Sequence, residues 1–168
     1  MLKQNYDPLK LKGLFHYLIK AAGARPGFGV TELYKLAWLS DAEFFALHGR
    51  SITGETYIRQ EFGPVPRHGE QLRTQLVSEG LVTPAPRHAE EDWLSLLDPD
   101  LSIFSTDELA TIDWWLKSVT GDLPEYGWEI AGMFEPLPYA AHLASRIREP
   151  DATQHDAHAA RARQLGLI

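Results

Sequence analysis

The stretch GRSITGETYIRQEFGPVPR, residues 49–67, constrains the fold more than any other part of the chain. Its three glycines and two prolines favour turns and end helices, and between them TYIRQEF alternates in the manner of a short strand. Pro64 and Pro66 cannot donate to a strand ladder, so we expect them to end that strand. The chain must therefore pass from helix to turn, strand and turn within this segment.

Two helices are expected before this stretch. Asp7 and Pro8 are typical of a helix start, and the helix should stop at Gly23. Thr31 is the expected cap of a second helix that ends at Gly49. That second helix carries two apolar stripes, so we expect it to be covered on two sides and to form the centre of the core. The first helix has one apolar face (Leu11, Leu14, Phe15, Leu18, Ile19, Ala22), and the second helix has two (Leu33, Leu36, Ala37, Phe44, Leu47 and Tyr34, Trp38, Phe45).

The rest of the chain continues the helical pattern. A third helix is expected from Pro66 through RHGEQLRTQLVSEG, with Leu72 and Leu76 facing inward. LVTPAPR and DWLSLL could then pair as a hairpin, and Ser105 with Glu108 forms a capping box for a fourth helix. A short helical piece carrying Trp128 and a last helix after Pro138 should follow. The fold class is therefore mostly α with a small antiparallel β element (α+β), a compact helical domain over residues 1–150 with a tail over residues 151–168.

Composition limits the function classes. The chain has no cysteine, which excludes disulfides, cysteine zinc sites and thiol nucleophiles. Its formal net charge of -7 argues against nucleic acid as the main partner, because phosphate binding needs a basic face. The first residues show no signal-peptide pattern, and no apolar run is long enough to cross a bilayer. We therefore expect a cytoplasmic protein with no membrane association.

No residue pattern in the chain is typical of a known catalytic centre. The sequence lacks G-x-S-x-G, H-E-x-x-H and P-loop motifs. His155 and His158 are close in sequence, but they lie in the alanine-rich tail with no nearby set of carboxylates to complete a metal site. We therefore expect no metal, no cofactor and no enzymatic activity.

Asp41 is the most informative polar residue, because it lies on the aromatic stripe of the second helix. Burying an unpaired carboxylate is costly, so it should be hydrogen-bonded or paired. Arg50, Thr53 and Tyr57 are close enough in sequence to reach it. Two interpretations stay open: a structural polar network that fixes the loop to the helix, or a binding pocket.

Residues 35–66, KLAWLSDAEFFALHGRSITGETYIRQEFGPVP, resemble the signature of the Panacea domain, found in SocA-type antitoxins and related phage-associated proteins. Glu55 stands where that signature usually has aspartate. The matching residues are Lys35, Leu36, Asp41, Gly49, Arg50, Ile52, Thr53, Gly54, Tyr57, Gly63, Pro64, Val65 and Pro66.

The resemblance implies a mostly helical fold with a small sheet and an antitoxin function. Its implied partner is a cognate protein toxin, which such domains neutralise either by direct binding or by delivery to an AAA-type protease. The residues that could contact the partner, or that simply carry the signature, are Asp41, Arg50, Thr53, Gly54, Tyr57, Arg59, Phe62, Gly63, Pro64 and Pro66.

Two alternatives belong to other function classes. A DNA-binding transcriptional regulator with a winged-helix-like fold would use RHGEQLRTQ as its recognition helix, with Arg67 and Arg73 facing the groove. An enzyme could be built around Asp41, Arg50 and Tyr57. The acidic charge opposes the first alternative, and the lack of a catalytic pattern opposes the second.

Overall fold

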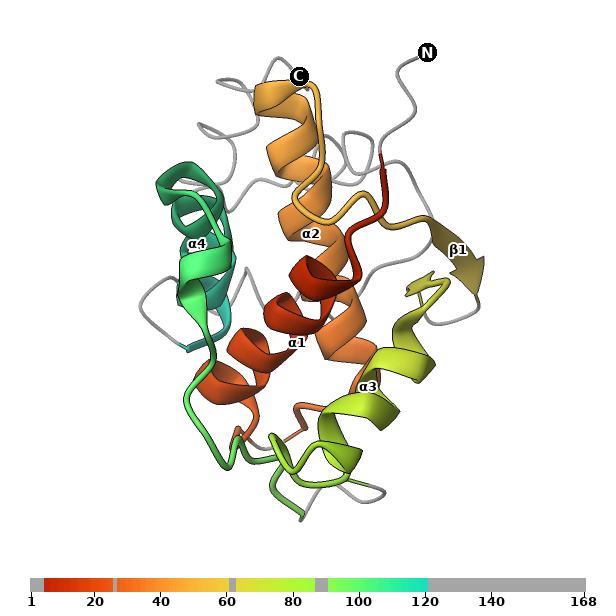
Figure 1. Ribbon diagram of the computed structural model, residues 1–168, viewed down its shortest axis with the longest axis vertical. Coiled ribbons are helices and arrows are strands. Elements are labelled where there is room, and N and C mark those ends of the chain that lie inside the picture. Colours follow the sequence, from red (N-terminus) through yellow and green to blue (C-terminus); the bar gives the residue numbers. More distant parts are fainter. Residues whose placement is uncertain (1–4, 26, 61–62, 87–90, 121–168) are drawn as a thin grey trace, which may run out of the picture.

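The computed structural model describes residues 5–25, 27–60, 63–86 and 91–120. The predicted α+β class is confirmed: these ranges contain four helices packed together and a small antiparallel sheet at one edge of the helices (Figure 1). The expectations for Trp128, for the helix after Pro138 and for the tail lie outside the described residues. The elements are α1 (Pro8–Ala22), α2 (Val30–His48), β1 (Tyr57–Gln60), β2 (Gly63–Pro66), α3 (Gly69–Ser78), a 3-10 turn (Leu101–Ile103) and α4 (Thr106–Thr120).

Helix α1 begins and ends as its local sequence predicts. The Asp7 carboxylate accepts hydrogen bonds from the backbone N–H groups of Leu9 and Lys10, at 3.0 and 3.1 Å, and Pro8 is the first helical residue. Gly23 caps the other end. All six apolar residues predicted to face inward are buried.

Helix α2 starts one residue before the predicted cap, so the assignment of Thr31 is wrong. Gly29 is the cap residue, and its backbone N–H donates to the Glu32 carboxylate at 2.9 Å. Glu32 therefore satisfies the N–H of the cap residue, which is the glutamate half of a capping box. The predicted end at Gly49 is confirmed, with a left-handed backbone at φ +71°.

The prediction that α2 is covered on both apolar stripes is wrong in its last turn. Tyr34 is buried and Trp38 is half-buried, but Phe45 is 54% exposed. Helices α1 and α4 and strand β2 all contact α2. Phe45 lies in the last turn before Gly49, where this cover does not reach it.

Helices α1 and α2 together form the centre of the core, which the sequence predicted for α2 alone; α1 has the most helix neighbours. It contacts the other three helices, and Figure 1 shows it crossing α2, with α3 and α4 on opposite sides. The core is formed mainly by fully buried aliphatic and aromatic side chains of α1 and α2, joined by Trp93 and Trp115. Burial of a side chain of this size stabilises the fold by roughly 1.5–3 kcal/mol.

The segment after β1 forms a hairpin, although Pro64 and Pro66 were expected to end the strand. Strand β2 contains both prolines and pairs with β1 in antiparallel register, Ile58 opposite Val65. The N–H of Arg67 donates to the Thr56 carbonyl at 2.9 Å, so hydrogen-bonding positions fall on every second residue of β2. The prolines take the alternate positions, where no amide hydrogen is needed.

Because Pro66 belongs to β2, α3 begins at Gly69 and not at Pro66 as predicted. A Cβ at Gly69 would lie within 2.8 Å of both Pro66 and the Tyr34 ring, so glycine lets the helix start close against α2. Leu72 and Leu76 face inward as expected.

The later elements follow the local signals in part. The two segments expected to pair after α3 do so over a short length, with Val82 opposite Ser95 in antiparallel orientation. The Thr83 N–H donates to the Leu94 carbonyl at 2.9 Å, and the Leu96 N–H donates to the Leu81 carbonyl at 2.8 Å. The capping box is confirmed: the Ser105 N–H donates to Glu108 at 2.9 Å, and the Glu108 N–H donates to the Ser105 hydroxyl at 3.2 Å. Within the described ranges, no helix is long and apolar enough to cross a membrane.

Candidate functional site

Asp41 is the centre of a buried hydrogen-bond cluster that joins α2 to the loop before β1. One carboxylate oxygen accepts the Thr53 N–H at 2.9 Å. The other accepts the Thr53 hydroxyl at 2.5 Å and the Tyr57 hydroxyl at 2.8 Å. Asp41 and Thr53 are both buried. The expectation that Asp41 is hydrogen-bonded, with Thr53 and Tyr57 as partners, is confirmed.

Burial dominates the electrostatics of this cluster. It raises the pKa of Asp41 to about 6, although the hydrogen bonds from Thr53, Tyr57 and the Ile52 backbone oppose the shift. The pKa of Tyr57 is raised well above its usual value, first by burial and then by the charge of Asp41. At neutral pH, Asp41 is therefore a carboxylate that accepts hydrogen bonds from neutral donors.

Arg50 does not reach Asp41, so that predicted pairing is wrong. Its guanidinium donates to the Glu108 carboxylate at 2.8 Å and lies over the Phe44 ring, 4.9 Å from the ring centroid. Arg50 follows directly after the left-handed Gly49, and from there its side chain extends to α4. The cation ties the end of α2 to the start of α4.

Glu108 is the carboxylate that pairs with Arg50, a contact that the sequence did not indicate. The Lys10 ammonium donates to both oxygens of the buried Glu108 carboxylate, at 2.7 and 2.9 Å. Arg50 donates to one of the same two oxygens. Burial raises the pKa of Glu108, but the bonds from Lys10, Ser105 and Arg50 outweigh burial and lower it overall. The capping box indicated Glu108 as a helix start, and no local pattern linked it to Lys10 or Arg50.

Gly54 lies where the N-terminal segment passes over the loop. The Asp7 N–H donates to the Thr53 carbonyl at 2.8 Å, and Gly54 has φ +67°. A Cβ on Gly54 would lie 2.3 Å from the Asn5 carbonyl oxygen. A glycine is therefore required here both for backbone conformation and for space.

Glu55 extends the cluster toward α3. Its buried side chain accepts the His68 N–H at 3.0 Å and lies 3.1 Å from the His68 ring nitrogen Nδ1. Tyr6 stacks on the same imidazole with a centroid separation of 4.3 Å. Sequence reasoning treated Glu55 only as a variation of the signature and gave His68 and Tyr6 no role.

The remaining predicted residues belong to the hairpin. Gly63, Pro64 and Pro66 are buried in β2, which packs on α2. Arg59 lies opposite Pro64 in the register. Phe62 lies outside the described residues.

Together these contacts use the signature residues to connect α2, the loop, the hairpin and α3. The described part of the chain contains no group of three or more His, Asp or Glu residues that could hold a metal ion. Arg73, proposed for a recognition helix, donates to the Tyr34 hydroxyl at 2.8 Å and lies over that ring. The arrangement fixes the loop before β1 on α2 and ties the end of α2 to α4.

A family model described as "Antitoxin SocA-like, Panacea domain" matches residues 33–121, just over half of the 168-residue chain. The matched region runs from the first turn of α2 to the end of α4 and includes Asp41, Arg50, Glu55 and Glu108. No curated protein and no solved structure matches the chain.

Proposed function

The chain belongs to the SocA-like antitoxin family that carries the Panacea domain, and from that membership we propose that it binds and neutralises one cognate protein toxin. The match over residues 33–121 is the observation that carries this proposal. We also propose that neutralisation takes place in the cytoplasm and without chemistry on the toxin. Two routes lead to it: direct binding that blocks the toxin, or delivery of the bound toxin to an AAA-type protease.

The signature residues with internal hydrogen bonds serve the fold, so partner contacts must come from other side chains. Asp41 accepts hydrogen bonds from Thr53 and Tyr57, and Arg50 donates to Glu108. The net charge of -7 would speed association with a basic toxin.

We propose the β1–β2 hairpin as one contact surface, with Arg59 and Phe62 as candidate partner residues. Ile58 in β1 is 42% exposed, so the hairpin presents an apolar side chain to solvent. Tyr57 is a weaker anchor than its sequence position indicates, because its hydroxyl is turned inward to Asp41. Its contribution is to hold the hairpin on α2.

Co-expression with the product of the neighbouring gene tests the function. We expect the neighbouring product alone to stop growth of a bacterial host and co-expression of this chain to restore growth. If growth is never restored, the antitoxin assignment is wrong.

Deleting the host's AAA-type proteases separates the two routes. Restored growth that survives these deletions supports direct neutralisation. Restored growth that is lost with a protease, while the two proteins still co-purify, supports delivery.

A further inference from the structure

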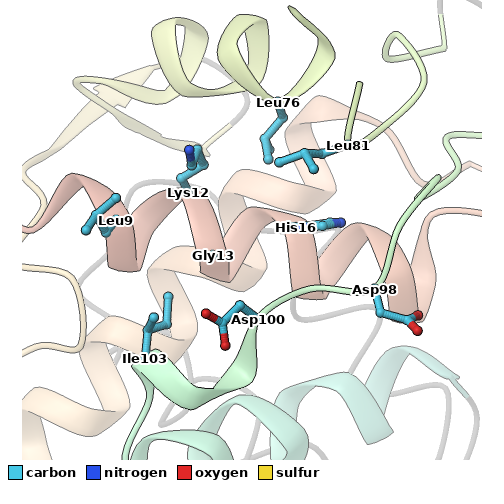
Figure 2. Close-up of a pocket in the computed structure, with 9 residues that line it drawn as sticks. All are labelled: Leu9, Lys12, Gly13, His16, Leu76, Leu81, Asp98, Asp100 and Ile103. Carbon is cyan, nitrogen blue, oxygen red and sulfur yellow. The ribbon is translucent and has the colours of Figure 1, made fainter. Parts of the chain in front are cut away.

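A groove of about 340 Å³ runs beside α1, between that helix, the end of α3 and the 3-10 turn (Figure 2). Its walls are aliphatic and come from Leu9, Leu76, Leu81 and Ile103. A Cβ at Gly13 would lie 2.4 Å from Ile103, so this glycine allows the 3-10 turn to approach α1. The volume is at the small end of the range for ligand sites, enough for a few side chains.

Leu9 is the most unusual residue of this groove. It is 65% exposed in the first turn of α1, directly after Pro8. The core does not need this side chain, because the buried face of α1 starts at Leu11. Leu9 lines the groove together with Leu76, Leu81 and Ile103, and a contiguous apolar surface of this kind is typical of a contact site.

Most charges around the groove are already paired. The Lys12 ammonium binds the Glu79 carboxylate at 2.9 Å, and the Lys20 ammonium binds Asp98 at 2.8 Å. His16 also lines the groove; burial lowers its pKa, so the imidazole adds no positive charge at neutral pH. These groups leave the rim close to neutral.

Asp100 is the exception. One of its oxygens accepts the Ser102 N–H at 3.0 Å and the Ser102 hydroxyl at 2.6 Å, which caps the 3-10 turn. Within the described residues it has no cationic partner. Figure 2 shows its carboxylate beside Ile103 and below Gly13, whereas that of Asp98 points away. Among the described residues, the groove therefore combines apolar walls with a carboxylate, that of Asp100, which no cation pairs.

We propose that this groove is a docking site for the toxin, which inserts an aliphatic side chain against Leu9, Leu76 and Ile103 and places a lysine or arginine against Asp100. The inference rests on the proposed function and adds the chemistry of the partner segment. Burial of the aliphatic group supplies affinity, and the charge-assisted bond to Asp100 fixes its position. A basic, leucine-bearing segment also complements the net charge of -7.

Two variants separate this surface from the fold. Leu9→Ala removes an exposed apolar wall, and Asp100→Asn removes the charge but keeps an oxygen that can accept from Ser102. Phe45→Ala is the matched control, because Phe45 is also large, apolar and exposed but does not line the groove. Melting temperatures of all three should stay close to that of the wild type.

Calorimetric titration of the full chain with the purified neighbouring gene product measures the dissociation constant of each variant. We expect Leu9→Ala and Asp100→Asn each to raise the dissociation constant about tenfold or more. Phe45→Ala should leave the dissociation constant unchanged. The Asp100→Asn effect should shrink at high salt, where a partly exposed ion pair is screened.

The other outcomes overturn the inference in distinguishable ways. Wild-type affinity in both groove variants would place the toxin elsewhere and leave the antitoxin function intact. A photo-crosslinker at position 9 that joins only the chain's own residues 121–168 would show that the groove serves the chain itself. A wild-type chain that neither binds nor restores growth removes both the proposed function and this docking site.

Discussion

At the scale of single residues, two buried carboxylates are stabilised in opposite ways. Asp41 is held by hydroxyl and backbone donors, and burial raises its pKa to about 6. Glu108 is held by Lys10 and Arg50, and its pKa is lowered despite burial. A raised acid pKa favours folding at low pH, and a lowered one favours folding at higher pH. The two residues should therefore respond in opposite directions when the pH falls.

Asp41→Asn tests the first half of this statement. The stabilising contribution of Asp41 is fully present below its ordinary pKa of 3.8 and is lost as the pH rises through about 6. Asparagine does not titrate, so the wild type should gain on the order of 2 kcal/mol relative to the variant between about pH 7.5 and about pH 4. Urea denaturation at both pH values measures this gain. A stability difference that does not change with pH would contradict the assignment.

Glu108→Gln tests the second half. The contribution of Glu108 is present above its ordinary pKa of 4.5 and is lost as the pH falls through its lower folded value. We expect the variant to lose about 1–3 kcal/mol near neutral pH, because Lys10 and Arg50 lose a charged acceptor. Glu79→Gln is the control: it breaks the exposed pair with Lys12 and should have no measurable effect. Equal losses in both variants would show that Glu108 is only another surface ion pair.

At the scale of elements, local signals predicted what local chemistry decides. Asp7 and Pro8 start α1, and Gly49 ends α2, because each acts on its own backbone neighbours. Contacts between distant segments could not be predicted in the same way. Arg50 pairs with Glu108, which lies far away in sequence. Asp41 was predicted as its partner because Asp41 is closer to Arg50 along the chain. The place of Pro64 in a strand likewise depended on a register that only the folded hairpin fixes.

Gly54 connects the loop, the N-terminal segment and the hairpin, and two glycine variants test its role. Gly49 and Gly54 have similar φ angles of +71° and +67°, but only Gly54 has a neighbour within contact distance. Gly49→Ala should cost about 1–2 kcal/mol from backbone strain alone. Gly54→Ala should cost clearly more, roughly 3 kcal/mol, because its Cβ meets the Asn5 carbonyl. Similar denaturation midpoints for the two variants would contradict the close approach.

At the scale of the whole molecule, the four described helices support both the buried cluster of Asp41, Thr53 and Tyr57 and the groove beside α1. Helix α1 contributes Lys10, which binds the Glu108 carboxylate together with Arg50. It also contributes Leu9 and Gly13 to the groove. The family model begins only at residue 33, so α1 lies outside the match although it completes both features. Sequence similarity alone therefore gave no indication of the groove.

The extent of the domain, residues 1–150 with a tail over residues 151–168, stays a prediction. The tail composition offers few large apolar groups to bury before Leu165. Deletion of residues 151–168 should leave the melting temperature nearly unchanged in a thermal scan. A fall of many degrees would show that this segment is part of the folded core.

The most direct test of the central claim is co-purification of the tagged chain with the untagged product of the neighbouring gene. If the chain is a toxin-binding domain, the two proteins should elute together in a fixed ratio. Their complex should have a dissociation constant of about 1 μM or lower. The ratio should persist through a second column in moderate salt. If the neighbouring product stays in the flow-through while cells producing both proteins grow normally, the chain does not act by binding a toxin, and the account is wrong at its centre.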